Sequence, residues 1–329
     1  MRMMKKMTAP LLALCLLAGC GTAARAPEAE PGEAAAYIDL VELKEAELEA
    51  EAVALSSSPA AVSTLLLPEA SGKQVKENGK AVIDYSNVKD GYVMAQFTAS
   101  TNNRLVVQTA GPTTTYTYNL TAGEWETFPL SDGNGSYKVT VLENVTGKKY
   151  AVVLSATVSV TLKDEFAPFL RPNQYVDYGG AVKTVKKAEE LTKGVSDPLK
   201  KVEKVYNFVV ENLSYDKGKA QSVKSGYLPV LDDVLAAKKG ICFDYASLMA
   251  GMLRSQGVPC KLVVGYAGTA YHAWINVWTE ETGWIDGVIF FDGSAWQRMD
   301  PTFASSGKGN EAIMKYIGDG SNYTVKYLY

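Results

Sequence analysis

Three residues that lie far apart in the sequence carry side chains able to act together as a nucleophile, a base and an orienting acid. Cys242 lies in Gly240–Met249 (GICFDYASLM), at the start of a helical pattern. His272 is the single histidine of the chain, and Asp300 precedes a proline in Arg298–Phe303 (RMDPTF). A thiol nucleophile needs a neutral base within hydrogen-bond reach, and the base needs a group that orients it. These residue types therefore predict a thiol nucleophile that is activated by a neighbouring base.

The segment after Cys242 is expected to be a helix that begins at the cysteine. Gly257 and Pro259 follow the pattern and predict its end. In the first turn of a helix, free backbone N–H groups and the helix dipole stabilise a thiolate. The alternative is a packed, inert cysteine, since cysteine is among the residue types most often buried. The apolar positions at helical spacing are Tyr245, Leu248, Met249, Met252 and Leu253.

The histidine lies in a strand pattern, Tyr271–Thr279 (YHAWINVWT). Alternation places His272, Trp274, Asn276 and Trp278 on one face of that strand. The alternative for His272 is a hydrogen-bonded histidine on a half-buried strand. For Asp300, it is an ordinary turn aspartate beside a proline.

Helices and strands are expected on either side of these residues. Three helices are predicted before Cys242. The first is Lys183–Thr192, the second starts at Ser196-Asp197-Pro198, and the third is Asp232–Lys238. Lys261–Tyr266 predicts a strand, and Trp284–Ser294 predicts an extra hairpin.

The ordered set of motifs resembles the transglutaminase-like superfamily, which has a papain-like thiol fold. The resemblance covers roughly residues 196–303, and no single motif in it is specific. The matching stretches are Asn212–Asp216 (NLSYD), Gly240-Ile241-Cys242, Asp244-Tyr245-Ala246, Gly265-Tyr266, His272-Ala273-Trp274 and Asp300-Pro301-Thr302.

The resemblance implies a role for each residue of the site. Cys242 would be the nucleophile, His272 the general base and acid, and Asp300 the residue that orients His272. The backbone N–H of Cys242 would hold part of the oxyanion. Animal transglutaminases use an upstream tryptophan as the second oxyanion donor, but no tryptophan precedes Cys242 in this part of the chain. Tyr215 is the candidate for that position, and no cofactor or metal is implied.

Three functions fit these residues. The first is an enzyme that acts on amide bonds through a thioester on Cys242, with hydrolysis slightly favoured over transfer to an amine. The second is a non-catalytic surface-binding lipoprotein that retains the fold, although a complete triad argues against this function. The third is a metal site formed by Cys242, His272 and Asp300, which lacks the short paired spacings of zinc motifs.

The first 20 residues resemble a bacterial lipoprotein signal peptide. Basic residues precede the apolar run Leu11–Ala18, and Leu17–Cys20 (LAGC) resembles a lipobox. An ordinary secretory signal is the alternative. With lipid on Cys20, the protein is expected on the outer face of a bacterial membrane, where it would act on a protein or peptide substrate. A net charge of −3 gives no reason to expect nucleic acid as a partner.

The predicted fold class is α+β, with a β-sandwich followed by a papain/transglutaminase-like core. Residues 21–74 would form an acidic tether rich in Ala, Glu and Pro, and 75–165 an immunoglobulin-like sandwich of short strands. Residues 171–329 would form the transglutaminase-like domain, with helices first and an antiparallel sheet after them. The expected strands are Gly91–Thr98, Arg104–Thr109, Thr113–Leu120, Ser136–Leu142 and Lys149–Thr161.

Cys242 and Cys260 are not expected to form a disulfide. They flank a helix whose ends lie on the order of 20 Å apart, whereas a disulfide needs α-carbons within about 7 Å. Cys260 is therefore interpreted as a small packed residue.

Overall fold

A computed structural model of the protein describes residues 65–224, 226–280, 283–285, 289–291, 296–298 and 322–329. These residues fall within one compact unit, Ala35–Tyr329. The predicted signal peptide, most of the predicted tether and Asp300 lie outside the described residues. The predicted division between residues 165 and 171 stays a prediction.

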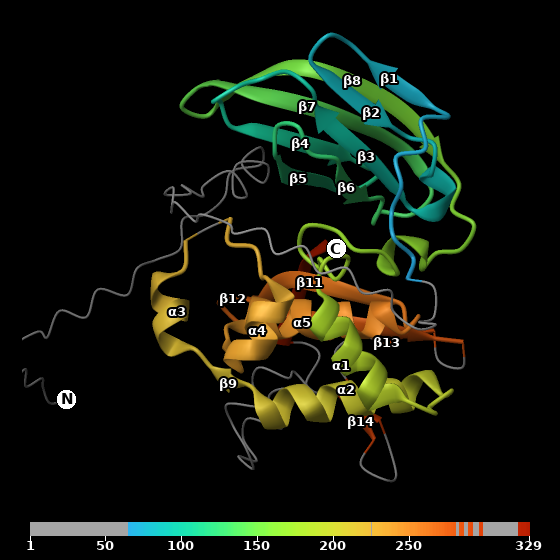
Figure 1. Ribbon diagram of the computed structural model, residues 1–329, viewed down its shortest axis with the longest axis vertical. Coiled ribbons are helices and arrows are strands. Elements are labelled where there is room, and N and C mark those ends of the chain that lie inside the picture. The colour runs from blue at the N-terminus through green and yellow to red at the C-terminus, as the bar shows by residue number, and fades with distance from the viewer. Residues whose placement is uncertain (1–64, 225, 281–282, 286–288, 292–295, 299–321) are drawn as a thin grey trace, which may run out of the picture. The chain divides into compact units, whose positions relative to one another are not determined.

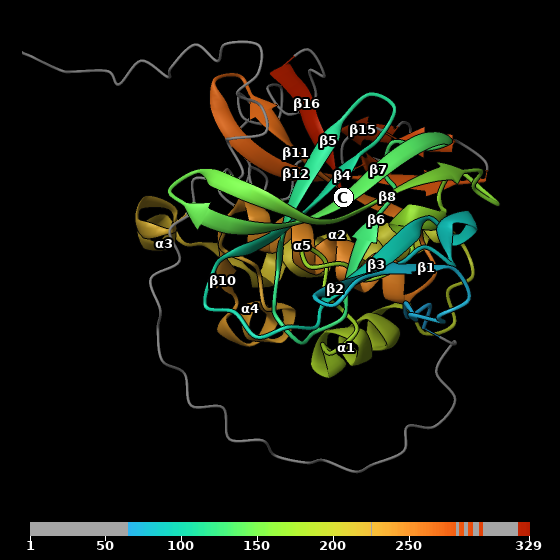
Figure 2. The ribbon, with the colours of Figure 1, turned by 90° about the horizontal axis from the view of Figure 1, so that it is seen from above.

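The first half of the described chain forms two four-stranded antiparallel sheets (Figures 1 and 2). One sheet has the order β1-β2-β3-β6 and the other the order β5-β4-β7-β8. The longest pair, β7 and β8, is seen as two neighbouring strands in Figure 2. The strands are β1 Val75–Glu77, β2 Ala81–Asp84, β3 Tyr92–Phe97, β4 Leu105–Ala110, β5 Thr115–Leu120, β6 Glu126–Pro129, β7 Gly135–Thr146 and β8 Lys149–Val160.

Alternation along the strands sets which side chains are buried. Tyr137 and Val139 on β7 are buried, whereas Ser136 and Lys138 between them are exposed. In the immunoglobulin constant fold, the first, second, fifth and fourth strands share one sheet. The sheet order here differs, so the immunoglobulin-like part of the prediction is not confirmed.

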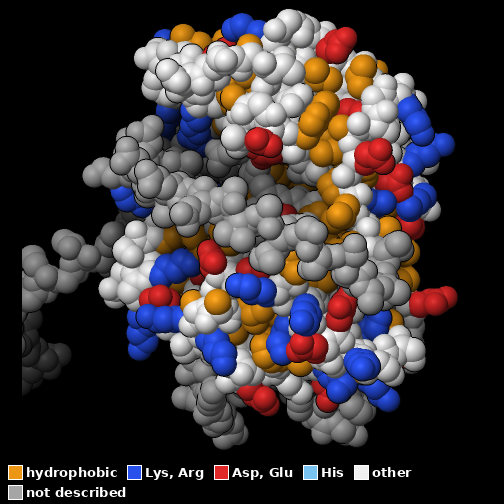
Figure 3. Space-filling model, viewed as in Figure 1, with side chains coloured by type: hydrophobic (Ala, Val, Ile, Leu, Met, Phe, Trp, Pro, Cys, Tyr) orange, Lys and Arg blue, Asp and Glu red, His pale blue; other side chains and the backbone are white. Residues whose placement is uncertain are grey.

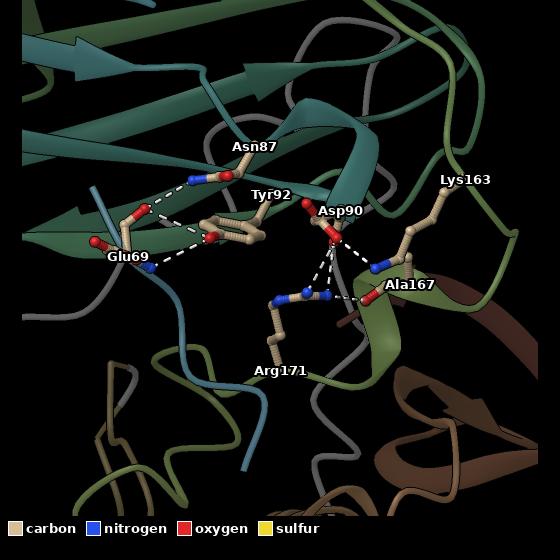
Figure 4. A network of polar contacts seen from close by, with 7 residues as sticks. All are labelled: Glu69, Asn87, Asp90, Tyr92, Lys163, Ala167 and Arg171. Atoms are coloured by element: carbon tan, nitrogen blue, oxygen red, sulfur yellow. Dashed lines mark hydrogen bonds and ion pairs between the residues drawn. The ribbon is translucent and has the colours of Figure 1, made fainter. Parts of the chain in front are cut away.

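Arg171 anchors the segment after the sheets to the turn before β3 (Figure 4). Its guanidinium donates to the backbone oxygen of Asp90 at 2.9 Å and to the Asp90 carboxylate at 3.2 Å. Lys163 donates to the same carboxylate oxygen at 2.5 Å. Burial opposes ionisation of Asp90, but the Lys163 hydrogen bond and the charges of Arg171 and Lys163 hold its pKa below the usual value. Arg171 also donates to the backbone oxygen of Ala167 at 3.4 Å, so the network joins the short 3-10 helices η1 (Val88–Asp90) and η2 (Ala167–Phe169).

The second half begins with helices. Asp197 caps α2 by accepting the backbone N–H of Leu199 at 2.9 Å, and Pro198 occupies the first helical position. In Figure 1, α1, α2 and α4 lie beside α5, and each of them contacts it. From Asp244 to Ser255, every residue of α5 is buried. The helices are α1 Val182–Thr192, α2 Pro198–Asn212, α3 Lys217–Ser222, α4 Leu231–Ala237 and α5 Cys242–Ser255.

A four-stranded antiparallel sheet of order β13-β12-β11-β16 follows the helices. Gly265 of β11 pairs with His272 of β12. A Cβ atom at Gly265 would lie 2.0 Å from the backbone oxygen of Thr324, so only glycine allows β16 to approach here. The strands are β11 Cys260–Ala267, β12 Ala270–Thr279, β13 Gly283–Ile285 and β16 Tyr323–Leu328, with the parallel pair β9 Ser214–Tyr215 and β10 Lys239–Gly240 and the hairpin β14 Ile289–Phe291 and β15 Trp296–Arg298.

Arg254 fixes the turn from α5 into β11. Its guanidinium donates to the backbone oxygens of Cys260 (2.8 Å), Arg171 (2.8 Å) and Tyr329 (2.6 Å). Burial lowers the pKa of Arg254 to about 10, so the side chain stays charged near neutral pH. One buried cation therefore connects the end of α5 to three separate segments.

The three helices predicted before Cys242 are confirmed, with boundaries that differ by a few residues, and so are the five predicted strands. The hairpin predicted over Trp284–Ser294 lies further along the chain than expected. The start of that range belongs to Gly283–Ile285, which pairs with β12, and the antiparallel pair is formed by β14 and β15. None of the described helices is long and apolar enough to cross a membrane. Acidic and basic side chains are interspersed on the face shown in Figure 3.

Candidate active site

Cys242 is the first residue of the buried helix α5. Ile241 precedes it with extended dihedrals, φ −95° and ψ 177°, so the chain enters the helix at the cysteine. Cys242 is half-buried, unlike the buried residues that follow from Asp244 onwards. The first N–H groups of a helix have no partner within the helix. The thiol therefore lies at the positive end of a helix that is otherwise enclosed.

Asp244 explains the glycine before the cysteine. Its carboxylate accepts the backbone N–H of Ile241 at 2.7 Å, which caps the start of α5. A Cβ atom at Gly240 would lie 2.5 Å from the Cβ of Asp244. The contacts of Asp244 thus explain both the glycine at the start of the Gly-Ile-Cys-Phe-Asp stretch and the aspartate at its end. Asp244 belongs to one of the stretches that match the family, but the sequence alone assigned it no role.

Tyr215 is paired through the backbone with the segment that precedes Cys242. Its strand β9 runs parallel to β10, where Tyr215 pairs with Gly240. The N–H of Asp216 donates to the oxygen of Gly240 at 2.8 Å and closes this pair. Tyr215 is half-buried and packs against the core. The structure therefore places the predicted oxyanion residue beside the segment that leads into the nucleophile.

His272 lies near the start of β12, and its side chain is 6% exposed. Its partner across the sheet is Gly265 of β11. Helix α5 contacts both β11 and β12. The helix that begins at Cys242 therefore packs against the strand that carries His272, and a hydrogen bond between the two side chains stays a prediction.

Tyr271, the residue before His272, is exposed at the start of β12. Its ring contacts the Tyr266 ring of β11, with centroids 5.5 Å apart.

The imidazole of His272 lies among aromatic rings. Its ring is 6.1 Å from Trp274 at an interplanar angle of 23° and 6.4 Å from Tyr323. This contact confirms that His272 and Trp274 share a face of the strand. Asp300 lies outside the described residues, so its role as the orienting acid stays a prediction.

Both cysteines of the described region are free thiols. The prediction that Cys242 and Cys260 form no disulfide is confirmed. Cys260 is buried, and burial raises the pKa of its thiol to about 12, an effect that the nearby Arg254 partly opposes. Within the described part of the chain, no group of three or more His, Cys, Asp and Glu residues could hold a metal ion.

Comparison with known proteins assigns the class of this region. Residues 185–301 match the model of the transglutaminase-like superfamily, so the chain contains a transglutaminase-like domain. Members of this superfamily are generally cysteine-based enzymes, either proteases or transglutaminases.

Relatives match parts of the chain. It is 34% identical over 70 residues to the protein-glutamine gamma-glutamyltransferase of Pseudomonas aeruginosa, which covers 17% of this chain and 10% of that protein. It is 30% identical over 180 residues to an uncharacterized protein of Mycobacterium leprae, which covers 50% of this chain and 55% of that protein. The chain thus spans a tenth to about half the length of these curated relatives.

Solved structures align with the chain at low similarity. The periplasmic domain of TgpA from Pseudomonas aeruginosa, bound to ethylmercury, aligns at a TM-score of 0.33 and 19% identity. The alignment covers 73% of this chain and 78% of that chain.

The two thiols should differ in reactivity. We expect iodoacetamide to alkylate Cys242 in the native protein at pH 8 and to leave Cys260 intact, because Cys260 is buried and stays protonated well above that pH. Mass spectrometry of the two cysteine peptides measures this. In a variant with Cys15 and Cys20 replaced by serine, unfolding without reductant should reveal two titratable thiols. Equal labelling of both cysteines in the native protein, or no thiol after unfolding, would contradict the placement of α5.

Proposed function

We propose that the protein is a cysteine enzyme that cleaves amide bonds through a thioester on Cys242. The observation that carries this proposal is the position of Cys242 at the start of α5, a helix that contacts the strand of His272, within a region that matches the transglutaminase-like superfamily. Asp300 follows His272 in the order that the family resemblance implies and is proposed as the residue that orients it.

The reaction begins with attack of the Cys242 sulfur on the substrate carbonyl. His272 takes the thiol proton, and the carbonyl electron pair moves onto oxygen to form a tetrahedral oxyanion. Collapse of this intermediate breaks the C–N bond, and the leaving amine takes the proton from His272. An acyl thioester remains on Cys242. Water or a second amine, deprotonated by His272, then attacks the thioester and restores the thiol.

The oxyanion is held by the backbone N–H of Cys242 and by the hydroxyl of Tyr215 in this proposal. The pairing of Tyr215 with Gly240 supports its role, because it fixes the backbone of Tyr215 beside the segment that precedes the nucleophile. Two donors that are in position before the reaction stabilise the charge that develops in the transition state.

Hydrolysis is the favoured outcome, because water is always present and no binding site for an amine is evident from the sequence. Amine transfer is the second outcome, since one partial relative is a protein-glutamine gamma-glutamyltransferase. A peptide library incubated with and without a fluorescent primary amine separates the two. Cleaved products alone indicate a hydrolase, and incorporation of the amine indicates a transferase. A protein without turnover on any member would support the non-catalytic surface-binding alternative.

Replacement of Cys242 by alanine should abolish turnover, with a loss of about 10³-fold or more. His272→Ala should be nearly as damaging, because the residues act as a unit and the chain has no other histidine. Thermal unfolding of Cys242→Ala should stay within a few degrees of the native protein, since this thiol is only half-buried.

Cys260→Ala is the matched control for that experiment. It removes a thiol that is fully buried, so it should lower the free energy of unfolding by about 1–2 kcal/mol while turnover persists. Full turnover in Cys242→Ala would rule out the thioester route.

We further propose that the protein is exported and anchored by a lipid on Cys20. The lipobox-like Leu17–Cys20 after the apolar run is the observation behind this proposal. Cys20→Ser should release the protein from the membrane fraction or leave an unprocessed precursor of higher mass. Unchanged fractionation and unchanged mass would refute the anchor.

A further inference from the structure

A buried carboxylate lies in the same helical turn as the proposed nucleophile. The Asp244 side chain is 0% exposed and accepts three hydrogen bonds. The donors are the N–H of Ile241 at 2.7 Å, the hydroxyl of Tyr227 at 2.6 Å and the ammonium of Lys219 at 2.8 Å. The Lys219 side chain is 28% exposed. Its carboxylate partner is therefore shielded from solvent, whereas the lysine is only partly shielded.

Lys219 is held toward Asp244 from two sides. Its ammonium donates to the Tyr227 hydroxyl at 2.6 Å and lies 4.0 Å from the centre of the Tyr227 ring. Its backbone N–H donates to Asp216, which caps α3, at 2.9 Å. Lys219 is thus positioned by the start of α3 and by Tyr227, which also donates a hydrogen bond to Asp244.

Asp244 carries its charge in the same first turn of α5 as Cys242. Residues two apart in a helix have α-carbons about 5.5 Å apart, but their side chains do not face each other, so the effect of Asp244 on the sulfur is electrostatic and involves no side-chain contact. A negative charge at the start of α5 opposes a second negative charge on the sulfur and offsets the positive end of the helix dipole. A buried ionised carboxylate also needs a partner of opposite charge to be stable. Without such a partner, the negative charge of Asp244 would disfavour the thiolate that the proposed reaction needs at Cys242.

Among the described residues, Lys219 is the cation that contacts Asp244. Burial, and then the hydrogen bond to Asp244, raise the pKa of Tyr227, so that phenol stays neutral. Lys239 pairs instead with Asp216 at 3.2 Å. The described elements that contact α5 or β10 carry further titratable residues, among them Tyr215 on β9, Asp233 on α4, and Tyr271 and His272 on β12.

We propose that Lys219 is a positioning residue that neutralises Asp244, so that the positive end of α5 remains available to stabilise a thiolate at Cys242. The inference rests on the proposed role of Cys242 as the nucleophile. It gives Lys219 of the short helix α3 an electrostatic function in addition to its contribution to stability.

The test is the pH dependence of alkylation of Cys242 by iodoacetamide in the full chain, read on the Cys242 peptide by mass spectrometry. Lys219→Met should move the midpoint of the rate profile to higher pH by about one to two units, because Asp244 then lacks its counter-charge. Lys219→Arg should restore the native midpoint. Lys217→Met is the matched control, since it removes an exposed charge two residues away on the same helix and should leave the midpoint unchanged.

A double substitution separates electrostatics from structural damage. Asp244→Asn alone should move the midpoint to lower pH, because Lys219 is then unopposed, and Lys219→Met with Asp244→Asn should return it toward the native value. A midpoint unmoved by Lys219→Met, or a double variant shifted further than Lys219→Met alone, overturns the proposal. The readout needs no substrate, so a failure of this inference, seen as an unmoved midpoint, is distinguished from a failure of the proposed function, seen as an absence of turnover.

Discussion

The buried helix α5 is held at each end by a charged side chain that solvent barely reaches. Asp244, at the start of the helix, is 0% exposed, and Arg254, near its end, is 2% exposed. Each has the sign that complements its end of the helix dipole. Each also has its hydrogen bonds made, and this is the condition under which a buried charge is tolerated. The position of Cys242 depends on this arrangement, because the helix can neither slide nor unwind at its first turn without breaking the contacts of Asp244.

The same constraint extends beyond the helix. Arg254 joins α5 to the backbone of Arg171 and Tyr329, so the segment after the sheets and the residue that follows β16 meet at one cation. At the other end, Asp244 joins α5 to Lys219 and Tyr227. Segments distant in sequence are therefore tied to the two ends of one helix. The close approach of β16 to Gly265 then keeps the sheet in contact at the level of His272.

Sequence reasoning predicted the elements whose pattern is local. The helix after Cys242 and the strand around His272 follow from side-chain periodicity, which depends only on neighbouring residues. The order of the sheets could not be predicted in this way, because alternation identifies a strand but not its partner. Likewise, β16 pairs with a strand about 60 residues earlier, and nothing in its own pattern indicates that partner. The Lys219–Tyr227–Asp244 cluster was missed because two of its members lie where no periodic pattern marks them.

The most direct test of the account is to trap the acyl-enzyme itself. After a brief reaction with p-nitrophenyl acetate and an acid quench, peptide mass spectrometry locates any acetyl group on the chain. The account predicts an acetyl thioester on Cys242 that disappears on treatment with hydroxylamine and forms far more slowly in His272→Ala. Acetylation confined to lysine side chains, or equal acetylation of Cys242 in the native protein and in His272→Ala, would contradict a nucleophile at the start of α5 that is activated by the histidine of β12.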